Sequence, residues 1–195
     1  MAKGSLTVIT GPMFSNKSGE LIRLATVHRI AGRKVGLFKH SLDDRYEGLE
    51  HISTHGGQSA EAEPVGSSAT IGLVASSYEV IAVDEVQFFD AGIVDVCMQL
   101  ADAGIRVIAA GLDQDFKRQP FGPMPALLSV AEEVSKMHAV CVRCRSAAHY
   151  SQRVSGGNAQ VEVGDSSYEA RCRACFEEYS GEPAEEPAVQ LTIPV

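Results

Sequence analysis

Few folds accommodate the loop at residues 11–18, which begins with glycine and ends with lysine followed by serine. It comes after a short apolar run, residues 6–10, and before a segment in which apolar side chains recur at helical spacing. In such a loop, backbone N–H groups and the helix start surround the phosphates of a nucleotide, while the lysine ammonium neutralises their oxygens. The residues predicted to bind phosphate are Gly11, Pro12, Met13, Phe14, Ser15, Asn16, Lys17 and Ser18. The Ser18 hydroxyl is also predicted to ligate Mg²⁺, and a chance strand–turn–helix is the alternative interpretation of this segment alone.

Asn16 occupies the position at which loops of this kind usually carry a second glycine. That position often needs a positive φ angle, which glycine adopts freely and which asparagine tolerates better than most other residues. We therefore expect the loop to close with Asn16 in the left-handed conformation.

Apolar runs at residues 34–38, 78–83 and 106–110 continue the pattern, and a helical pattern lies between them at residues 91–103. Strands that alternate with helices predict βαβ units, and hence an α/β fold with a mostly parallel sheet flanked by helices. Ligands of such sheets bind beyond the carboxyl ends of the strands. Residues 40–64 are polar, and we expect a long loop there rather than a packed element. On the helix, we expect the buried side chains to be Val94, Met98 and either Leu100 or Ala101.

Two acidic residues, Asp84 and Glu85, follow the run at 78–83. Nucleoside triphosphatases of this type place a metal-coordinating carboxylate there, so Asp84 is the predicted partner of Ser18 at Mg²⁺. Glu85 is then free to accept the proton of an alcohol as that alcohol receives a phosphoryl group. An amide and two aromatic rings follow directly at residues 87–89, and such side chains are typical of binding sites. The alternative is that both acids merely end a strand in solvent.

Two Cys-x-x-Cys pairs are separated by 27 residues. This spacing predicts a four-thiolate structural zinc site formed by Cys141, Cys144, Cys172 and Cys175. We assign residues 1–136 to the nucleotide-binding domain, residues 137–180 to a small zinc-binding domain, and residues 181–195 to a flexible tail rich in proline and glutamate. The fifth cysteine, Cys97, is expected to be an inert residue of the core.

The formal net charge of −8 disfavours a nucleic acid polymer as partner, because proteins that bind nucleic acid polymers usually present a basic surface to the phosphates. The apolar runs are far shorter than the roughly 18 residues that indicate a membrane span. With no secretory leader recognised at the start, we expect a cytoplasmic protein that contacts no membrane. In that compartment cysteines bind metals or stay reduced rather than form disulfides.

In this order, the motifs resemble those of the zinc-containing thymidine kinases, the type found in many bacteria and in animal cytosol. The matching segments are residues 11–18, 43–46, 84–89, 111–122, the cysteine pair at 141 and 144, and residues 168–175. The resemblance covers residues 6 to about 176. It implies a RecA-like P-loop domain with a zinc-binding lasso or lid. It also implies ATP-dependent phosphorylation of the 5′-hydroxyl of thymidine to dTMP, a step of pyrimidine deoxynucleoside salvage for DNA synthesis.

The resemblance also assigns roles to residues. Glu85 matches the family's catalytic base, and Asp43, Arg45, Asp84 and Gln87 lie in segments that face the phosphates of ATP. The base of thymidine is expected to lie between the lasso and an apolar pocket. The lasso residues are Val161, Glu162, Val163 and Tyr168, and the pocket residues are Met13, Phe88, Leu112, Phe116 and Phe121. For Phe116 and Phe121, ordinary core packing is the alternative. The lasso is shorter here than in the family, which could relax the preference for thymidine.

A homotetramer is suggested by the resemblance, and inhibition by dTTP is a question that it raises. Two other functions are compatible with some of these motifs: a degenerate kinase acting as a nucleotide-binding regulator, and a zinc-ribbon ATPase acting on nucleic acid. The presence of Lys17, Ser18, Asp84 and Glu85 favours an active kinase over the former. The net charge disfavours the latter.

Overall fold

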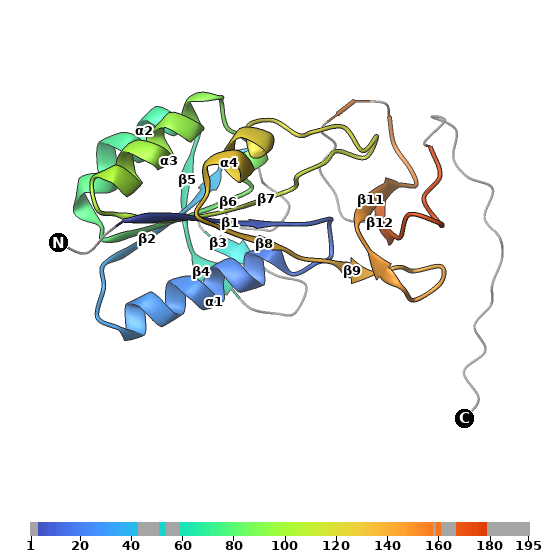
Figure 1. The fold of residues 1–195 in the computed structure, drawn as a ribbon, viewed down its shortest axis with the longest axis horizontal. Coiled ribbons are helices and arrows are strands. Elements are labelled where there is room, and N and C mark those ends of the chain that lie inside the picture. Colours follow the sequence, from blue (N-terminus) through green and yellow to red (C-terminus); the bar gives the residue numbers. More distant parts are fainter. Residues whose placement is uncertain (1–3, 43–50, 54–58, 158, 161–166, 179–195) are drawn as a thin grey trace.

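A six-stranded sheet forms the centre of the computed structural model, which describes residues 4–42, 51–53, 59–157, 159–160 and 167–178 (Figure 1). All neighbouring strands in this sheet are parallel. Their order is β5 (Glu63–Val65), β2 (Val35–His40), β6 (Val80–Asp84), β7 (Arg106–Gly111), β1 (Ser5–Thr10) and β8 (Glu133–Lys136). The predicted α/β class is therefore confirmed.

Helices cover both faces of the sheet (Figure 1). Helix α1 (Lys17–Ile30) lies on one face, where Leu21 and Ala25 pack against Ile9 of β1. The other face is covered by α2 (Ser68–Val74), α3 (Gly92–Asp102) and α4 (Met124–Val130). Two short 3-10 helices, η1 (Ala75–Ser77) and η2 (Val86–Phe88), complete this layer. With both faces covered, the central strands are apolar almost throughout, as the sequence shows.

In α3 the predicted buried side was partly wrong. Ile93 and Cys97 are the fully buried residues, whereas the side chain of Met98 is 42% exposed. Val94 and Leu100 are partly buried and pack against the core, as expected. Residues four apart share one side of a helix, and the pair at 93 and 97 rather than 94 and 98 faces the sheet.

The expectation of an unpacked loop at residues 40–64 was also wrong. Strands β3 (His51–Ser53) and β4 (Ser59–Glu61) form an antiparallel pair, and β5 extends the sheet beside β2. Ile52 and Ala62 are buried against the α1 side of the core. These strands have three residues each, too few to show a period in the sequence, and their burial depends on neighbours far along the chain.

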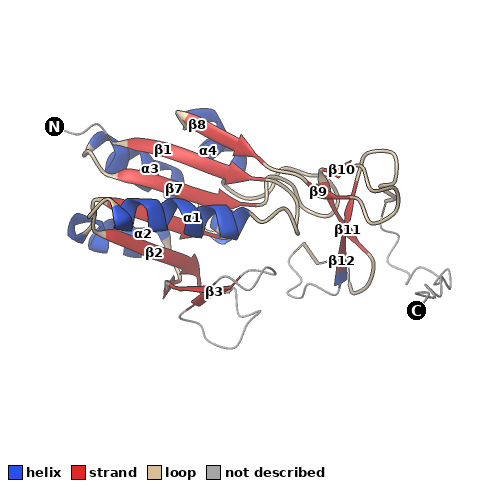
Figure 2. Ribbon diagram, turned by 90° about the horizontal axis from the view of Figure 1, so that it is seen from below, coloured by secondary structure: helices blue, strands red, loops and turns tan. Residues whose placement is uncertain are grey.

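Four short strands form a small unit beyond the carboxyl ends of β1 and β7 (Figure 2). Strand β9 (Ala139–Val140) pairs with β10 (Ala147–Ala148), and β11 (Tyr150–Arg153) pairs with β12 (Tyr168–Arg171). A separate apolar cluster, which includes Ala139, Ala148 and Ala170, lies inside this unit. We refer to residues 137–178 as the cysteine unit. The predicted domain boundary at 136 stays a prediction, and the predicted tail at 181–195 lies outside the described residues.

Across the described ranges, none of the helices has the length and apolar character needed to cross a membrane.

Candidate active site

The phosphate loop connects the end of β1 to the start of α1, as predicted. Asn16 has φ 63° and ψ 32°, which confirms that this position needs the left-handed conformation. Gly11 has φ 145°, and a β-carbon there would lie 2.5 Å from the carbonyl oxygen of Met137. The loop therefore passes so close to the backbone after β8 that only glycine fits at residue 11.

Lys17 is buried at the first turn of α1, with 9% of its surface exposed. Its Nζ donates a hydrogen bond to the carbonyl oxygen of Pro12 at 2.9 Å, and the Ser15 hydroxyl donates to the same oxygen at 2.7 Å. The ammonium is thus held inside the loop beside the start of the helix. Both features favour a negatively charged group at this place.

Asp84 and Glu85 are buried at the end of β6, with 3% and 7% of their surface exposed. The alternative that both merely end a strand in solvent is therefore wrong. Glu85 has φ 52°, a left-handed conformation that costs a residue with a β-carbon free energy. Such conformations persist where the surrounding structure enforces them, often at functional sites. This backbone turns the chain from β6 directly into η2.

The carboxylate of Glu85 is oriented by the side chain of Gln87. Gln87 Nε2 donates to Glu85 Oε2, and Gln87 Oε1 accepts a hydrogen bond from the backbone N–H of Leu112 at 3.0 Å. Since an N–H can only donate, the oxygen of the amide must face Leu112 and its NH₂ must face Glu85. Gln87 was predicted on the phosphate side, whereas these two contacts join the acidic pair to the loop after β7.

Glycines let that loop close on Gln87. A β-carbon at Gly111 would lie 2.6 Å from Gln87 Oε1, and one at Gly122 would lie 2.2 Å from the Gln87 carbonyl oxygen. Gly122 also has φ 50°. A larger residue at either end of the segment 111–122 would therefore collide with Gln87.

Aromatic rings gather beside the acidic pair. The rings of Phe88 and Phe121 are in edge contact with centroids 5.8 Å apart. Met13 is buried on the phosphate loop. Leu112 is half-buried, and Phe116 is buried beneath the guanidinium of Arg153, 3.6 Å from its ring centroid. Core packing alone does not describe Phe116, because a cation covers one face of its ring.

The cysteine unit contacts both the phosphate loop and the segment 111–122. The N–H of Met13 donates to Ser151 Oγ at 3.0 Å, and Gln160 Nε2 donates to Asp115 Oδ2 at 3.0 Å. Ser151 and Arg153, both buried on β11, were missed by the sequence reasoning. Polar residues in a four-residue strand carry no periodic signal. Their contacts with Met13 and Phe116 join residues more than 35 positions apart in the chain.

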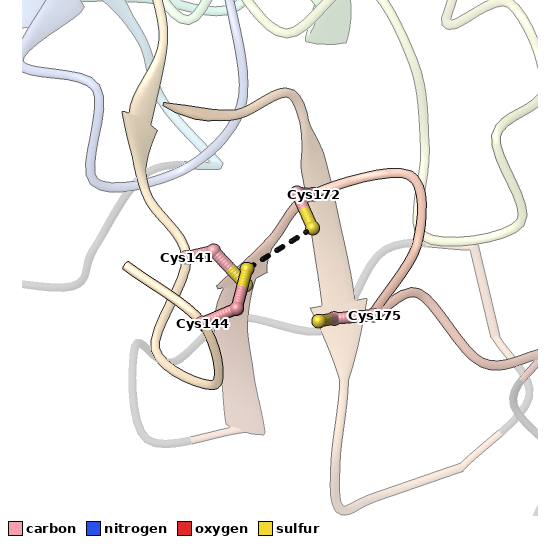
Figure 3. A group of neighbouring side chains, drawn as sticks. All are labelled: Cys141, Cys144, Cys172 and Cys175. Carbon is pink, nitrogen blue, oxygen red and sulfur yellow. Dashed lines mark hydrogen bonds between the residues drawn. The ribbon is translucent and has the colours of Figure 1, made fainter. Parts of the chain in front are cut away.

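Four cysteines bring their sulfur atoms together in this unit (Figure 3). The four Sγ atoms lie within 4.8 Å of one another, and those of Cys144 and Cys172 are 3.5 Å apart. A tetrahedral zinc site with Zn–S bonds of about 2.3 Å has sulfur atoms about 3.8 Å apart, so the geometry fits such an ion. The cluster Cys141, Cys144, Cys172 and Cys175 can therefore hold a metal ion, as the spacing predicted.

The protonation of these thiols is shaped by their surroundings. Burial opposes the thiolate of Cys141, but backbone N–H groups, first that of Cys144, outweigh it and lower its pKa to about 6. Hydrogen bonds to the side chains of Cys144 and Cys172 raise the pKa of Cys175 to about 12. Cys97 lies apart, in the core on α3, where burial raises its pKa to about 12, in line with the expected inert residue.

Several predicted site residues lie outside the described part of the chain: Asp43, Arg45, Val161, Glu162 and Val163. Of the predicted lasso, Tyr168 is described. It begins β12, pairs with Arg153 of β11, and its hydroxyl contacts the guanidinium of that residue.

A family model described as thymidine kinase matches residues 4–176, which include the phosphate loop, the acidic pair and all four clustered cysteines. The chain belongs to the thymidine kinase family. Relatives in this family include the thymidine kinase of Bacteroides fragilis (strain YCH46), 47% identical over 176 residues that make up 90% of this chain and 88% of the relative. The thymidine kinase of Porphyromonas gingivalis (strain ATCC 33277) is 46% identical over 185 residues, 94% of this chain and 90% of the relative.

A more distant likeness exists among solved structures. The Legionella pneumophila ATPase DotB aligns with a TM-score of 0.38 and 19% identity over 67% of this chain and 35% of that chain. At this TM-score and identity, the likeness is too weak to support a conclusion about this chain.

Proposed function

We propose that this protein transfers the γ-phosphoryl group of ATP to the 5′-hydroxyl of thymidine, giving ADP and dTMP. The observation that carries the proposal is the buried carboxylate of Glu85, oriented by Gln87, at the same sheet edge as the phosphate loop in a chain of the thymidine kinase family. Both strands that lead to these groups, β1 and β6, end at the edge where parallel α/β sheets bind ligands.

The phosphates of ATP are held by the backbone of residues 11–18 and by Lys17 in this proposal. Asp43 and Arg45 would add to the phosphate side, and a planar guanidinium suits phosphoryl oxygens. Mg²⁺ would be bound by Ser18 and Asp84, the first at the start of α1 and the second at the end of β6. The ion supplies neutralisation of charge on the transferred phosphoryl group.

Glu85 takes up the proton in the transfer. As the 5′-oxygen of thymidine forms its bond to the γ-phosphorus, the bond from that phosphorus to the β–γ bridging oxygen breaks, and the hydroxyl proton passes to the carboxylate of Glu85. A carboxylate oxygen can accept this proton only while it points at the hydroxyl. The hydrogen bond from Gln87 Nε2 to Glu85 Oε2 holds the carboxylate in one direction.

The thymine ring would lie in the apolar pocket near the acidic pair. Its walls would be formed by Met13, Phe88, Leu112, Phe116, Phe121 and Tyr168, with Val161, Glu162 and Val163 pairing with the ring edge through their backbone. A flat pyrimidine with a methyl group suits a pocket lined mostly by aromatic and aliphatic side chains with few polar groups.

Zinc bound by the four cysteines would have a structural role. The ion would cross-link the turn after β9 to the turn after β12, which together hold β11 and its residues Ser151 and Arg153 in place. Four thiolates leave no open position on the ion, so no chemistry is assigned to it.

No observation favours the regulator or the zinc-ribbon ATPase over the kinase. The homotetramer, the cytoplasmic location and inhibition by dTTP stay predictions. Gel filtration with light scattering would test the first, and turnover measured at increasing dTTP would test the last.

The direct test is to incubate the protein with Mg-ATP and a panel of deoxynucleosides and to separate the products by chromatography. We expect dTMP and ADP in equal amounts from thymidine. The Glu85→Gln variant should bind ATP almost normally and lose at least about a hundredfold in turnover, because general bases contribute roughly that much. Absence of dTMP at high concentrations of the unaltered protein would contradict the proposal.

A further inference from the structure

Arg153 is the largest of the fully buried side chains in the described part of the chain, with 1% of its surface exposed. It lies at the end of β11, opposite Tyr168 on β12. A buried guanidinium costs much free energy unless its N–H groups find acceptors and its charge finds a favourable field. Those partners therefore indicate what the residue does.

The edge of the guanidinium is bound by backbone carbonyls of residues that follow β11 in the chain. Nη1 donates to the carbonyl oxygens of Gly157 at 2.8 Å and Ala159 at 2.5 Å, and Nη2 donates to the hydroxyl oxygen of Tyr168. Gly157 and Ala159 are thereby held against the end of the β11–β12 pair. The next residue, Gln160, contacts the segment 111–122, because its Nε2 donates to Asp115 Oδ2.

The flat face of the guanidinium lies over Phe116, with the carbon of the guanidinium 3.6 Å from the ring centroid. The Tyr168 ring is 5.1 Å from the same atom. Phe116 belongs to the segment after β7, whereas Tyr168 belongs to the cysteine unit. One planar cation thus contacts two rings from two different parts of the chain. Its face lies over the Phe116 ring, and it contacts Tyr168 both at the ring and through the hydrogen bond to the hydroxyl.

We propose that Arg153 is a positioning residue of the nucleoside pocket, which sets the distance between Phe116 and Tyr168 and so controls binding of the pyrimidine base but not of ATP. This inference rests on the proposed function, because it takes both rings as walls of the thymidine pocket. The residue acts through these rings and touches none of the reacting atoms. Lysine cannot replace it, since an ammonium lacks both the planar face and the fork of donors.

The test compares Arg153→Lys with Arg173→Lys in the full chain. Arg173 also lies over an aromatic ring of the cysteine unit, that of Tyr150 at 5.4 Å, but it is exposed and contacts neither Phe116 nor Tyr168 in the described contacts. We expect Arg153→Lys to raise the KM for thymidine by about tenfold or more, since misplacement by ~1 Å can cost about a hundredfold in rate. The KM for ATP and the zinc content should change by less than about twofold. Arg173→Lys should leave all these values unchanged.

A second pair of variants tests whether the effect passes through the ring. If Arg153 acts by placing Phe116, the loss in kcat/KM for thymidine in Arg153→Lys/Phe116→Leu should be clearly smaller than the product of the two single losses. The ratio of thymidine to deoxyuridine turnover is measured in each variant as well. This ratio does not depend on the amount of folded protein, so it remains valid if Arg153→Lys is of low stability.

The outcomes separate the two proposals. If the unaltered protein makes dTMP and Arg153→Lys keeps its thymidine KM within twofold, the inference about Arg153 is wrong while the proposed function stands. A parallel rise of the KM values for thymidine and ATP, with loss of zinc, would also overturn it, because it would show a general structural role. If the unaltered protein makes no dTMP, the proposed function itself fails and the inference with it.

Discussion

The side chain of Asn16 lies over Gly19, so closely that a β-carbon on residue 19 would be 2.2 Å from Asn16 Oδ1. Asn16 takes the left-handed conformation before α1, and Gly19 is the third residue of that helix. The absence of a side chain at residue 19 therefore makes room for the carboxamide at residue 16. The asparagine that replaces the loop's second glycine is therefore accommodated by a glycine one helical turn later, Gly19.

This relationship predicts that the two positions depend on each other. Gly19→Ala alone should lower the melting temperature and raise the KM for ATP, because the new methyl group displaces the Asn16 side chain. Asn16→Gly/Gly19→Ala should restore both values, and could exceed the original stability, since alanine is favoured over glycine inside a helix by about 1 kcal/mol. Thermal melts and ATP kinetics of the single and double variants test this. Effects that simply add would show that the positions are independent.

Gln87 is expected to affect turnover more than ATP binding. Gln87→Leu removes the donor to Glu85 and leaves the N–H of Leu112 without its acceptor, a loss of about 1–3 kcal/mol for a buried group. We expect kcat to fall by at least about tenfold while the KM for ATP changes little. Gln119→Leu is the matched control, because Gln119 is exposed and its side chain makes one long contact, 3.4 Å to the carbonyl oxygen of Lys117. An equal fall in both variants would contradict the role of Gln87.

Ser151 should couple the cysteine unit to the phosphate loop. Ser151→Ala removes the acceptor of the Met13 N–H, a buried donor, and should cost about 1–3 kcal/mol of stability or of ligand binding. Ser151→Thr keeps the hydroxyl and should retain most of the activity. Isothermal titration with ATP and with thymidine measures where the loss falls. Unchanged stability and binding in Ser151→Ala would mean that this hydrogen bond is dispensable.

Loss of the metal site should lower thymidine turnover, because the bound ion holds the cysteine unit together. Cys172→Ser removes one of four thiolates, and the protein should then contain well under one zinc per chain by metal analysis. Because β11 carries both Ser151 and Arg153, thymidine turnover should fall with the zinc content. Cys97→Ala is the control and should keep its zinc, since Cys97 lies on α3 away from the cluster. Full turnover of a zinc-free protein would contradict the structural role.

Cys97 itself should be unreactive in the folded protein. Burial raises its pKa to about 12, so almost none of this thiol is ionised at pH 8, and the thiolate is the reactive form. The reactivity of Cys97 should rise only at a pH at which an exposed cysteine is already fully ionised. Mass spectrometry after brief iodoacetamide treatment at pH 8 should find Cys97 unmodified in the native protein and modified after unfolding. Rapid native labelling would show that α3 opens readily.

Much of the site could be predicted from local patterns. The phosphate loop, the acids after a strand and the paired cysteines each depend on spacing within about 10 residues, or on one motif repeated, and the chain preserves that spacing when it folds. The left-handed Asn16 followed from the same reasoning. The apolar runs likewise predicted the parallel strands β1, β2, β6 and β7, because strands covered on both faces are apolar throughout.

Other features depend on contacts between residues far apart in the chain. The short strands β3, β4 and β5 gain their stability from neighbours rather than from their own sequence, so they were missed. Gln87 could be noticed as an amide beside two acids, but its direction is decided by the N–H of Leu112, 25 residues later. Ser151 and Arg153 gave no signal, because a single polar residue in a short strand is ordinary until its burial is known.

The sequence alone therefore determined the chemistry that is available: a phosphate loop, a pair of carboxylates and four thiolates. The tertiary structure decided how these groups are aimed. It buried Asp84 and Glu85, turned the Gln87 amide toward the carboxylate, and placed Arg153 between Phe116 and Tyr168. The physical reason is that spacing along the chain survives folding, whereas the orientation of a side chain is set by hydrogen bonds and packing from segments that come together only in three dimensions.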